Sequence, residues 1–165
     1  SREVVETLIS LKSRLPHTVL LMGNHERMLL EAYEGRQVGL FLVNGGMETL
    51  TSYGLTPETM AQLPAQHVEF MRALPLWHQT GDYIFVHAGL KPGVPLAQQQ
   101  EKDVLWIRDD FIYSQWDFGK TVVFGHTPFA QPLLKPGLIG IDTGAGFGLR
   151  LSCVKLPERT VVTLA

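Results

Sequence analysis

Apolar residues repeat at a helical period in the first half of the chain and form short continuous runs in the second half. In residues 1–15 the apolar side chains recur every three or four positions, which predicts a helix that closes before Pro16. The same spacing predicts helices over residues 25–33, 47–53 and 56–74, with an interruption at Pro64 in the last of them.

Runs of β-branched and aromatic residues predict the strands. Residues 18–22 are expected to form a buried parallel strand, because such strands are covered on both faces. Residues 75–80 and 83–87 flank Gly81-Asp82, which is typical of a β-hairpin. Strands that we expect to be antiparallel follow at residues 121–124, 138–141, 149–156 and 160–164. These elements predict an α/β or α+β fold with a layered sheet, in a single domain over residues 1–165.

The composition is that of an ordinary globular protein, with 45% hydrophobic and 18% charged residues. The net charge of -2 provides no general attraction for nucleic acid or for an anionic membrane. No apolar run approaches the roughly 18–20 residues that span a bilayer, and the first residues show no signal peptide. Cys153 is the single cysteine, so no disulfide framework is possible, and we expect a small buried residue in a reducing, cytoplasmic protein.

Polar side chains follow three of the predicted strands directly. Asn24 and His25 come after residues 18–22, His87 ends the hairpin, and His126 follows residues 121–124. Glycine stands beside each of these positions, as at a tight turn from a sheet edge. Neutral nitrogen and oxygen ligands from distant segments predict a metal site at the carboxyl edge of the sheet.

These turns resemble motifs of the calcineurin-like metallophosphoesterases. Within that superfamily they are most similar to the branch of bacterial and phage serine/threonine protein phosphatases and symmetrical dinucleoside tetraphosphatases. The resemblance runs nearly the whole length of the chain and implies a β-sheet sandwich flanked by helices. The matching strings, in chain order, are Gly23-Asn24-His25-Glu26, Val86-His87-Ala88-Gly89, Trp106-Ile107-Arg108, Gly125-His126-Thr127-Pro128 and Ile141-Asp142-Thr143-Gly144.

The resemblance implies a metal-dependent hydrolase in which a metal-activated hydroxide attacks phosphorus. Family members hold two divalent ions, and the match makes Asn24, His87 and His126 ligands of one of them. An amide oxygen with two imidazoles suits Mn²⁺, iron or Zn²⁺ better than Ca²⁺ or Mg²⁺, and of these three we expect Mn²⁺.

Two further residues receive roles from the same resemblance, and Glu26 receives one from its place beside them. His25 matches the general acid that protonates the leaving alkoxide, and it also faces the substrate. Arg108 matches an arginine that binds the substrate phosphate, as a planar guanidinium can do through two oxygens. Glu26 is expected to orient the active-site groups without binding metal.

Two motifs that precede the Asn-His-Glu turn in the family are not found in this sequence: an Asp-x-His and a Gly-Asp-x-x-Asp-Arg-Gly turn. We therefore expect the chain to be N-terminally incomplete, lacking the first strand of the family's sheet. A truncated sequence and a late-starting reading frame both explain this. On this expectation the chain supplies at most one partial metal site and hydrolyses phosphate esters poorly or not at all.

The first functional hypothesis is a serine/threonine protein phosphatase, acting on phosphoproteins or small phosphoesters. Hydrolysis of dinucleoside tetraphosphates is the alternative within the same chemistry. A hypothesis from another class is a catalytically silent phosphate-binding module. A fourth is a structural half that completes its sheet with another chain.

Several of the residues could have purely structural roles. Arg108 could pair with Asp109 or Asp110 on a surface helix, and Asp142 is expected to cap a turn before Gly144. Other residues are expected to be structural. His17, His67 and His78 have no motif around them, and the tryptophans are expected to be core anchors, namely Trp77, Trp106 and Trp116.

Overall fold

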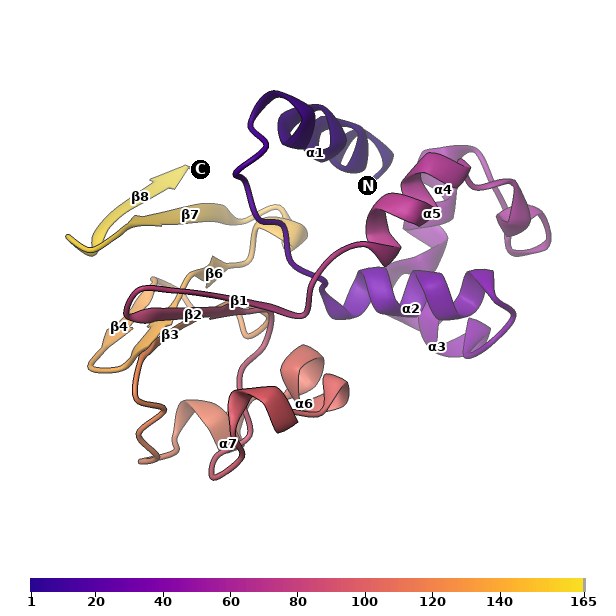
Figure 1. The fold of residues 1–165 in the computed structure, drawn as a ribbon. Helices are drawn as coiled ribbons and strands as arrows, with labels where there is room; N and C mark the ends of the chain where they lie inside the picture. The colour runs from indigo at the N-terminus through magenta and orange to yellow at the C-terminus, as the bar shows by residue number, and fades with distance from the viewer. Residues whose placement is uncertain (165) are drawn as a thin grey trace. The chain divides into compact units, whose positions relative to one another are not determined.

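The computed structural model describes residues 1–164, which form two compact units (Figure 1). The first unit comprises Ser1–Pro75, and the second begins at Leu76. None of the helices over residues 1–164 is long and apolar enough to cross a membrane.

The first unit is helical, as the apolar spacing predicts. α1 ends where Pro16 follows closely, and Gly54 ends α4 in the left-handed conformation (φ 72°) that glycine adopts without strain. The segment 56–74 divides at Pro64, as expected. The helices are α1 (Arg2–Arg14), α2 (Asn24–Tyr33), α3 (Val38–Phe41), the π-helical turn η1 (Leu42–Gly46), α4 (Met47–Tyr53), the 3₁₀ helix η2 (Pro57–Gln62) and α5 (Ala65–Arg72).

The predicted strand over residues 18–22 is wrong. Thr18 to Gly23 run without strand structure, and Val19 is 42% exposed. One backbone bond, from the Met22 N–H to the Pro75 carbonyl (2.9 Å), ties the segment to the rest of the unit. A strand exists only where a neighbour completes its ladder, and the first unit contains no strand among the described residues.

The second unit contains two sheets. The five-stranded sheet has the order β1-β2-β3-β5-β4, and the three-stranded sheet has the order β6-β7-β8. The first sheet consists of β1 (Trp77–Thr80), β2 (Tyr83–Val86), β3 (Thr121–Phe124), β4 (Leu133–Lys135) and β5 (Leu138–Gly140). The second consists of β6 (Asp142–Thr143), β7 (Arg150–Lys155) and β8 (Thr160–Leu164).

The pairing corrects one sequence expectation. β1 and β2 form the predicted antiparallel hairpin, but β2 pairs with β3 and β3 with β5 in parallel. The second half of the chain is therefore not a set of antiparallel strands alone. The β2-to-β3 crossover contains the short helices η3 (Leu96–Gln98), α6 (Glu101–Trp106) and α7 (Asp109–Ile112).

A hydrophobic core joins the crossover helices to the five-stranded sheet. Figure 1 shows α6 and α7 below that sheet and the β7–β8 hairpin above it. Phe111 of α7 is fully buried between the rings of Phe118 and Phe124, with centroid distances of 5.4 and 5.0 Å. The core residues are Ile84, Val86, Leu90, Val104, Phe111, Ile112, Val122, Phe124 and Leu138.

One face of the three-stranded sheet carries a chain of linked hydroxyl groups. On this face, the hydroxyls of Thr143, Ser152 and Thr163 are linked at 2.8 and 2.9 Å. Cys153 lies on the opposite face and is exposed, so the expectation that it is buried was wrong. Alternation placed it correctly in a strand, but which face is covered depends on the neighbouring layer.

Candidate functional site

Two histidines meet at the ends of neighbouring parallel strands. His87 directly follows β2, and His126 follows β3 after Gly125. Because β2 and β3 are parallel, their carboxyl ends lie at the same edge of the sheet. The Gly125 N–H donates to the His87 carbonyl (2.8 Å), and Nε2 of His87 lies 3.3 Å from Nδ1 of His126. The structure thus brings together two of the three predicted metal ligands.

A strained turn holds the ring of His126 in place. His126 has φ 64°, a left-handed conformation that costs a non-glycine residue roughly 1–2 kcal/mol. The Thr127 N–H donates to the Gly125 carbonyl across it (2.7 Å), which makes a three-residue γ-turn centred on His126. This type of turn is rare and strained, and such strain concentrates at functional sites.

The spacing of the two imidazoles fits a shared metal ion. Two nitrogens bound at roughly 2.0–2.1 Å to one tetrahedral ion stand about 3.4 Å apart, close to the 3.3 Å between His87 and His126. Neutral imidazole nitrogens are also common ligands of divalent transition metals. Residues 1–164 contain no group of three or more His, Cys, Asp or Glu that could hold an ion by themselves. The histidine pair therefore fits as part of a ligand set that needs other donors.

The remaining residues of the Asn-His-Glu motif lie in the first turn of α2, in the first unit. Asn24 is buried (3% exposed), whereas His25 is exposed. The Glu26 carboxylate accepts a hydrogen bond from the Gly23 N–H (3.0 Å), which is half of a capping box. Glu26 thereby fixes the turn from which Asn24 and His25 project.

Arg108 lies in the break between α6 and α7, beside the histidine turn. Its Nη1 donates to Oγ1 of Thr127 at 3.4 Å, and Thr127 directly follows His126. Among the described residues, Arg108 makes no ion pair with Asp109 or Asp110, so the simple surface pairing is not what the structure contains. The exposed guanidinium has donors left for an anion.

Trp106 is a site neighbour that sequence reasoning missed. Its indole contacts the His126 ring edge to face, with centroids 5.8 Å apart and planes at 83°. It is 38% exposed and is not the core anchor that we expected. A bond from the Ala88 N–H to the Val104 carbonyl (2.9 Å) fixes the end of α6 beside His87. The signal available in the sequence was its place two residues before Arg108.

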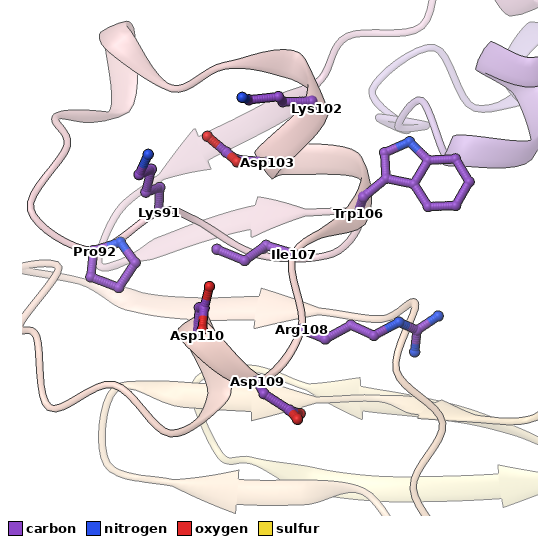
Figure 2. Close-up of a pocket in the computed structure, with 9 residues that line it drawn as sticks. All are labelled: Lys91, Pro92, Lys102, Asp103, Trp106, Ile107, Arg108, Asp109 and Asp110. Carbon is purple, nitrogen blue, oxygen red and sulfur yellow. The ribbon is translucent and has the colours of Figure 1, made fainter.

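Trp106 and Arg108 also line an open groove of about 880 Å³ (Figure 2). Three cationic and three carboxylate side chains contribute to it, so the groove has no uniform sign of charge. Its lining residues are Lys91, Pro92, Lys102, Asp103, Trp106, Ile107, Arg108, Asp109 and Asp110.

Asp142 has the structural role expected of it. Its Oδ1 accepts a hydrogen bond from the Gly144 N–H (2.8 Å), which closes an Asx turn after β6. His67, in the first unit, is buried with Nδ1 2.9 Å from the Tyr53 hydroxyl, and it is structural as well.

Comparison with known proteins identifies the family of this arrangement. The sequence model of the family described as "Calcineurin-like phosphoesterase" matches residues 1–150. The chain belongs to the calcineurin-like phosphoesterase family. It is therefore a member of a hydrolase family that uses divalent metal ions, as the motifs implied.

Named relatives of this calcineurin-like phosphoesterase fall into two groups. The asymmetrical bis(5'-nucleosyl)-tetraphosphatase PrpE of Geobacillus sp. is 27% identical, over 99% of this chain and 73% of the relative. Serine/threonine-protein phosphatase 1 of Salmonella typhimurium is 32% identical, over 81% of this chain and 64% of the relative. The two names differ in the substrate that they give.

The fold of the calcineurin-like phosphoesterase chain also matches a solved structure. A crystal structure for which diadenosine tetraphosphatase activity has been proposed superposes with a TM-score of 0.72. It covers 96% of this chain and 72% of the other, at 22% identity. The expected mixed α/β fold, with a sheet flanked by helices, is thus confirmed.

Proposed function

We propose that the edge of the sheet marked by His87 and His126 is part of a site for the hydrolysis of phosphate esters. The observation that carries this proposal is the 3.3 Å approach of the two imidazole nitrogens from parallel strands. The positive φ of His126 supports it, because residues held in sparsely populated backbone conformations concentrate at functional sites. The guanidinium of Arg108, which donates a hydrogen bond to Thr127 next to His126, supplies the group that binds the substrate phosphate.

The proposed ligands come from residues that the chain itself provides. His87 and His126 supply imidazole nitrogens, and the motif resemblance adds the amide of Asn24. This donor set fits a divalent transition metal, and among Mn²⁺, iron and Zn²⁺ we infer Mn²⁺ as the first choice. When bound, the ion supplies charge stabilisation of the phosphoryl oxygens and a nucleophile from water at neutral pH.

The protein residues divide the remaining tasks. Arg108 orients the phosphoryl group through two guanidinium donors while its link to Thr127 limits its movement. His25, exposed at the first turn of α2, gives a proton to the leaving oxygen. Glu26 holds that turn through Gly23.

Two substrates are consistent with this chemistry. The Salmonella relative supports a phosphoprotein of the serine/threonine type, and the Geobacillus relative supports a dinucleoside polyphosphate. Both reactions transfer a phosphoryl group to water, from a phosphate ester in the first case and from a phosphoanhydride in the second.

The test is turnover of a phosphoserine peptide and of a dinucleoside tetraphosphate by the purified protein with Mn²⁺. We expect His87→Ala and His126→Ala each to lower kcat/KM on the order of 100-fold or more, because even the partners of metal ligands contribute 10–100-fold. His17→Ala, an exposed histidine outside the motifs, serves as the matched control.

Two outcomes would overturn the proposal. One is turnover that survives chelation of the metal or loss of either histidine. The other is phosphate binding that depends on Arg108 without any turnover, which would instead support the silent phosphate-binding module.

A further inference from the structure

We propose that Trp106 binds the nucleobase of the substrate, so that the site prefers a nucleotide phosphoester to a phosphoserine peptide. The inference rests on the proposed function and names the substrate class of the same site. It begins from an exposed indole at the end of α6, a helix whose preceding residues Val104 and Leu105 are fully buried.

The side chains of Trp106 and Arg108 lie on the same side of the segment that joins α6 to α7 (Figure 2). α6 ends at Trp106, and Ile107 is extended (φ -59°, ψ 144°), so the chain leaves the helix between Trp106 and Arg108. Figure 2 shows the Trp106 and Arg108 side chains pointing to the right, while Ile107 points to the left. Ile107 packs against the core, which fixes the direction of the other two.

An aromatic plane beside a phosphate-binding guanidinium matches the chemistry of a nucleotide. A nucleobase offers a π face for stacking on the indole, and its phosphate would lie at Arg108. A phosphoserine side chain has no ring to stack. Both residues line the open groove of about 880 Å³.

The contact between Trp106 and His126 offers a competing role, in which the indole only positions the histidine ring. The two roles differ in what they recognise. If Trp106 only positions His126, loss of the indole changes metal binding and the turnover of every phosphoester. If Trp106 stacks on the base, its loss changes the affinity only of ligands that carry a base.

The experiment compares binding of adenosine 5'-monophosphate and inorganic phosphate by calorimetry, at the same Mn²⁺ concentration. Trp106→Leu keeps apolar bulk against His126 and removes the aromatic face, and Trp106→Tyr restores an aromatic face. Trp116→Leu is the matched control, because Trp116 is also exposed (55%) but lies outside the site.

We expect the wild-type protein to bind the nucleotide more tightly than phosphate. Trp106→Leu should weaken nucleotide binding roughly 5- to 150-fold, the usual range for loss of one base stack, and leave phosphate affinity unchanged. Trp106→Tyr should recover most of the loss, and Trp116→Leu should behave as wild type. In turnover, KM should rise for the dinucleoside substrate and stay constant for the phosphoserine peptide.

Equal weakening of nucleotide and phosphate in Trp106→Leu would overturn the inference and assign Trp106 to positioning His126. So would a wild-type protein that binds neither probe, or that binds both equally. If the protein binds the nucleotide more tightly than phosphate but turns over neither substrate, the role of Trp106 is supported and the proposed hydrolysis is refuted. The failure of one proposal can therefore be told from the failure of the other.

Discussion

A single methyl group added at Gly89 is expected to displace the segment that carries Arg108. Gly89 follows His87 and Ala88 where the chain turns away from β2. A Cβ atom at this position would lie 2.3 Å from Cδ1 and 2.6 Å from Cγ of Phe111, and 2.9 Å from Cγ2 of Ile107. Carbon atoms in contact normally stand about 3.5–4.0 Å apart, so the Phe111 ring would have to move by about 1.2 Å.

The surrounding core leaves little room for that movement. Phe111 is fully buried, and the rings of Phe118 and Phe124 hold it at 5.4 and 5.0 Å. Overpacking of this kind costs roughly 1–3 kcal/mol, and a ring confined on two sides places Gly89→Ala near 3 kcal/mol. For a chain of this size that corresponds to a decrease in Tm of about 6–12 °C.

Tryptophan fluorescence is a selective assay for this loss, because all three tryptophans lie in the second unit. Gly146→Ala is the matched control, since an added Cβ there meets no atom within 4 Å. Thermal and urea unfolding of the two variants should differ by the full overpacking cost. The surviving folded Gly89→Ala protein should also bind phosphate more weakly, because Ile107 adjoins Arg108. Equal stability of the two variants would refute the packing argument.

Three further variants test other parts of the molecule. Arg108→Lys keeps the charge but loses the planar donor pair, so phosphate affinity measured by calorimetry should fall about tenfold. Tyr53→Phe leaves the buried Nδ1 of His67 without the hydroxyl now 2.9 Å away, and should lower the free energy of unfolding, followed by circular dichroism of the helical unit, by about 1–3 kcal/mol. The Arg72 guanidinium hydrogen-bonds Glu34 and holds the pKa of that carboxyl below its ordinary 4.5. The contribution of ionised Glu34 to stability is therefore complete above pH 4.5 and is lost as the pH falls through the lower folded-state pKa. The urea midpoint of the wild-type protein should fall between about pH 5 and about pH 3, and that of Glu34→Gln should fall less.

For each of these variants, one result would contradict the prediction. Arg150→Lys, at an exposed arginine of β7, should leave phosphate affinity unchanged, and an equal effect of both lysine variants would argue against a specific site. Tyr113→Phe, at a tyrosine that is 70% exposed, should be neutral, and a neutral Tyr53→Phe would show that the hydrogen bond contributes little. If the urea midpoints of Glu34→Gln and the wild-type protein fall equally on acidification, the ion pair of Glu34 does not cause the loss of stability.

The sequence by itself predicted what depends on neighbours in the chain. In the first unit, apolar spacing and stop signals such as Gly54 predicted the helical segments 1–15, 25–33, 47–53 and 56–74. The β1–β2 hairpin follows from two apolar runs around Gly81. The motif residues His87 and His126 were also found in this way, because each follows a short apolar run. Local patterns carry this information because backbone propensity and turn chemistry act over a few residues.

The tertiary structure alone decided what depends on partners distant in sequence. Residues 18–22 have a strand composition, but no adjacent strand in their unit completes a ladder. Cys153 alternates correctly in β7 and still lies on the exposed face, because the covering layer is set elsewhere in the chain. The strained turn at His126, the link from Arg108 to Thr127 and the contact of Trp106 with His126 likewise exist only once β2, β3 and α6 pack together. Their geometry is non-local, so no sequence window contains it.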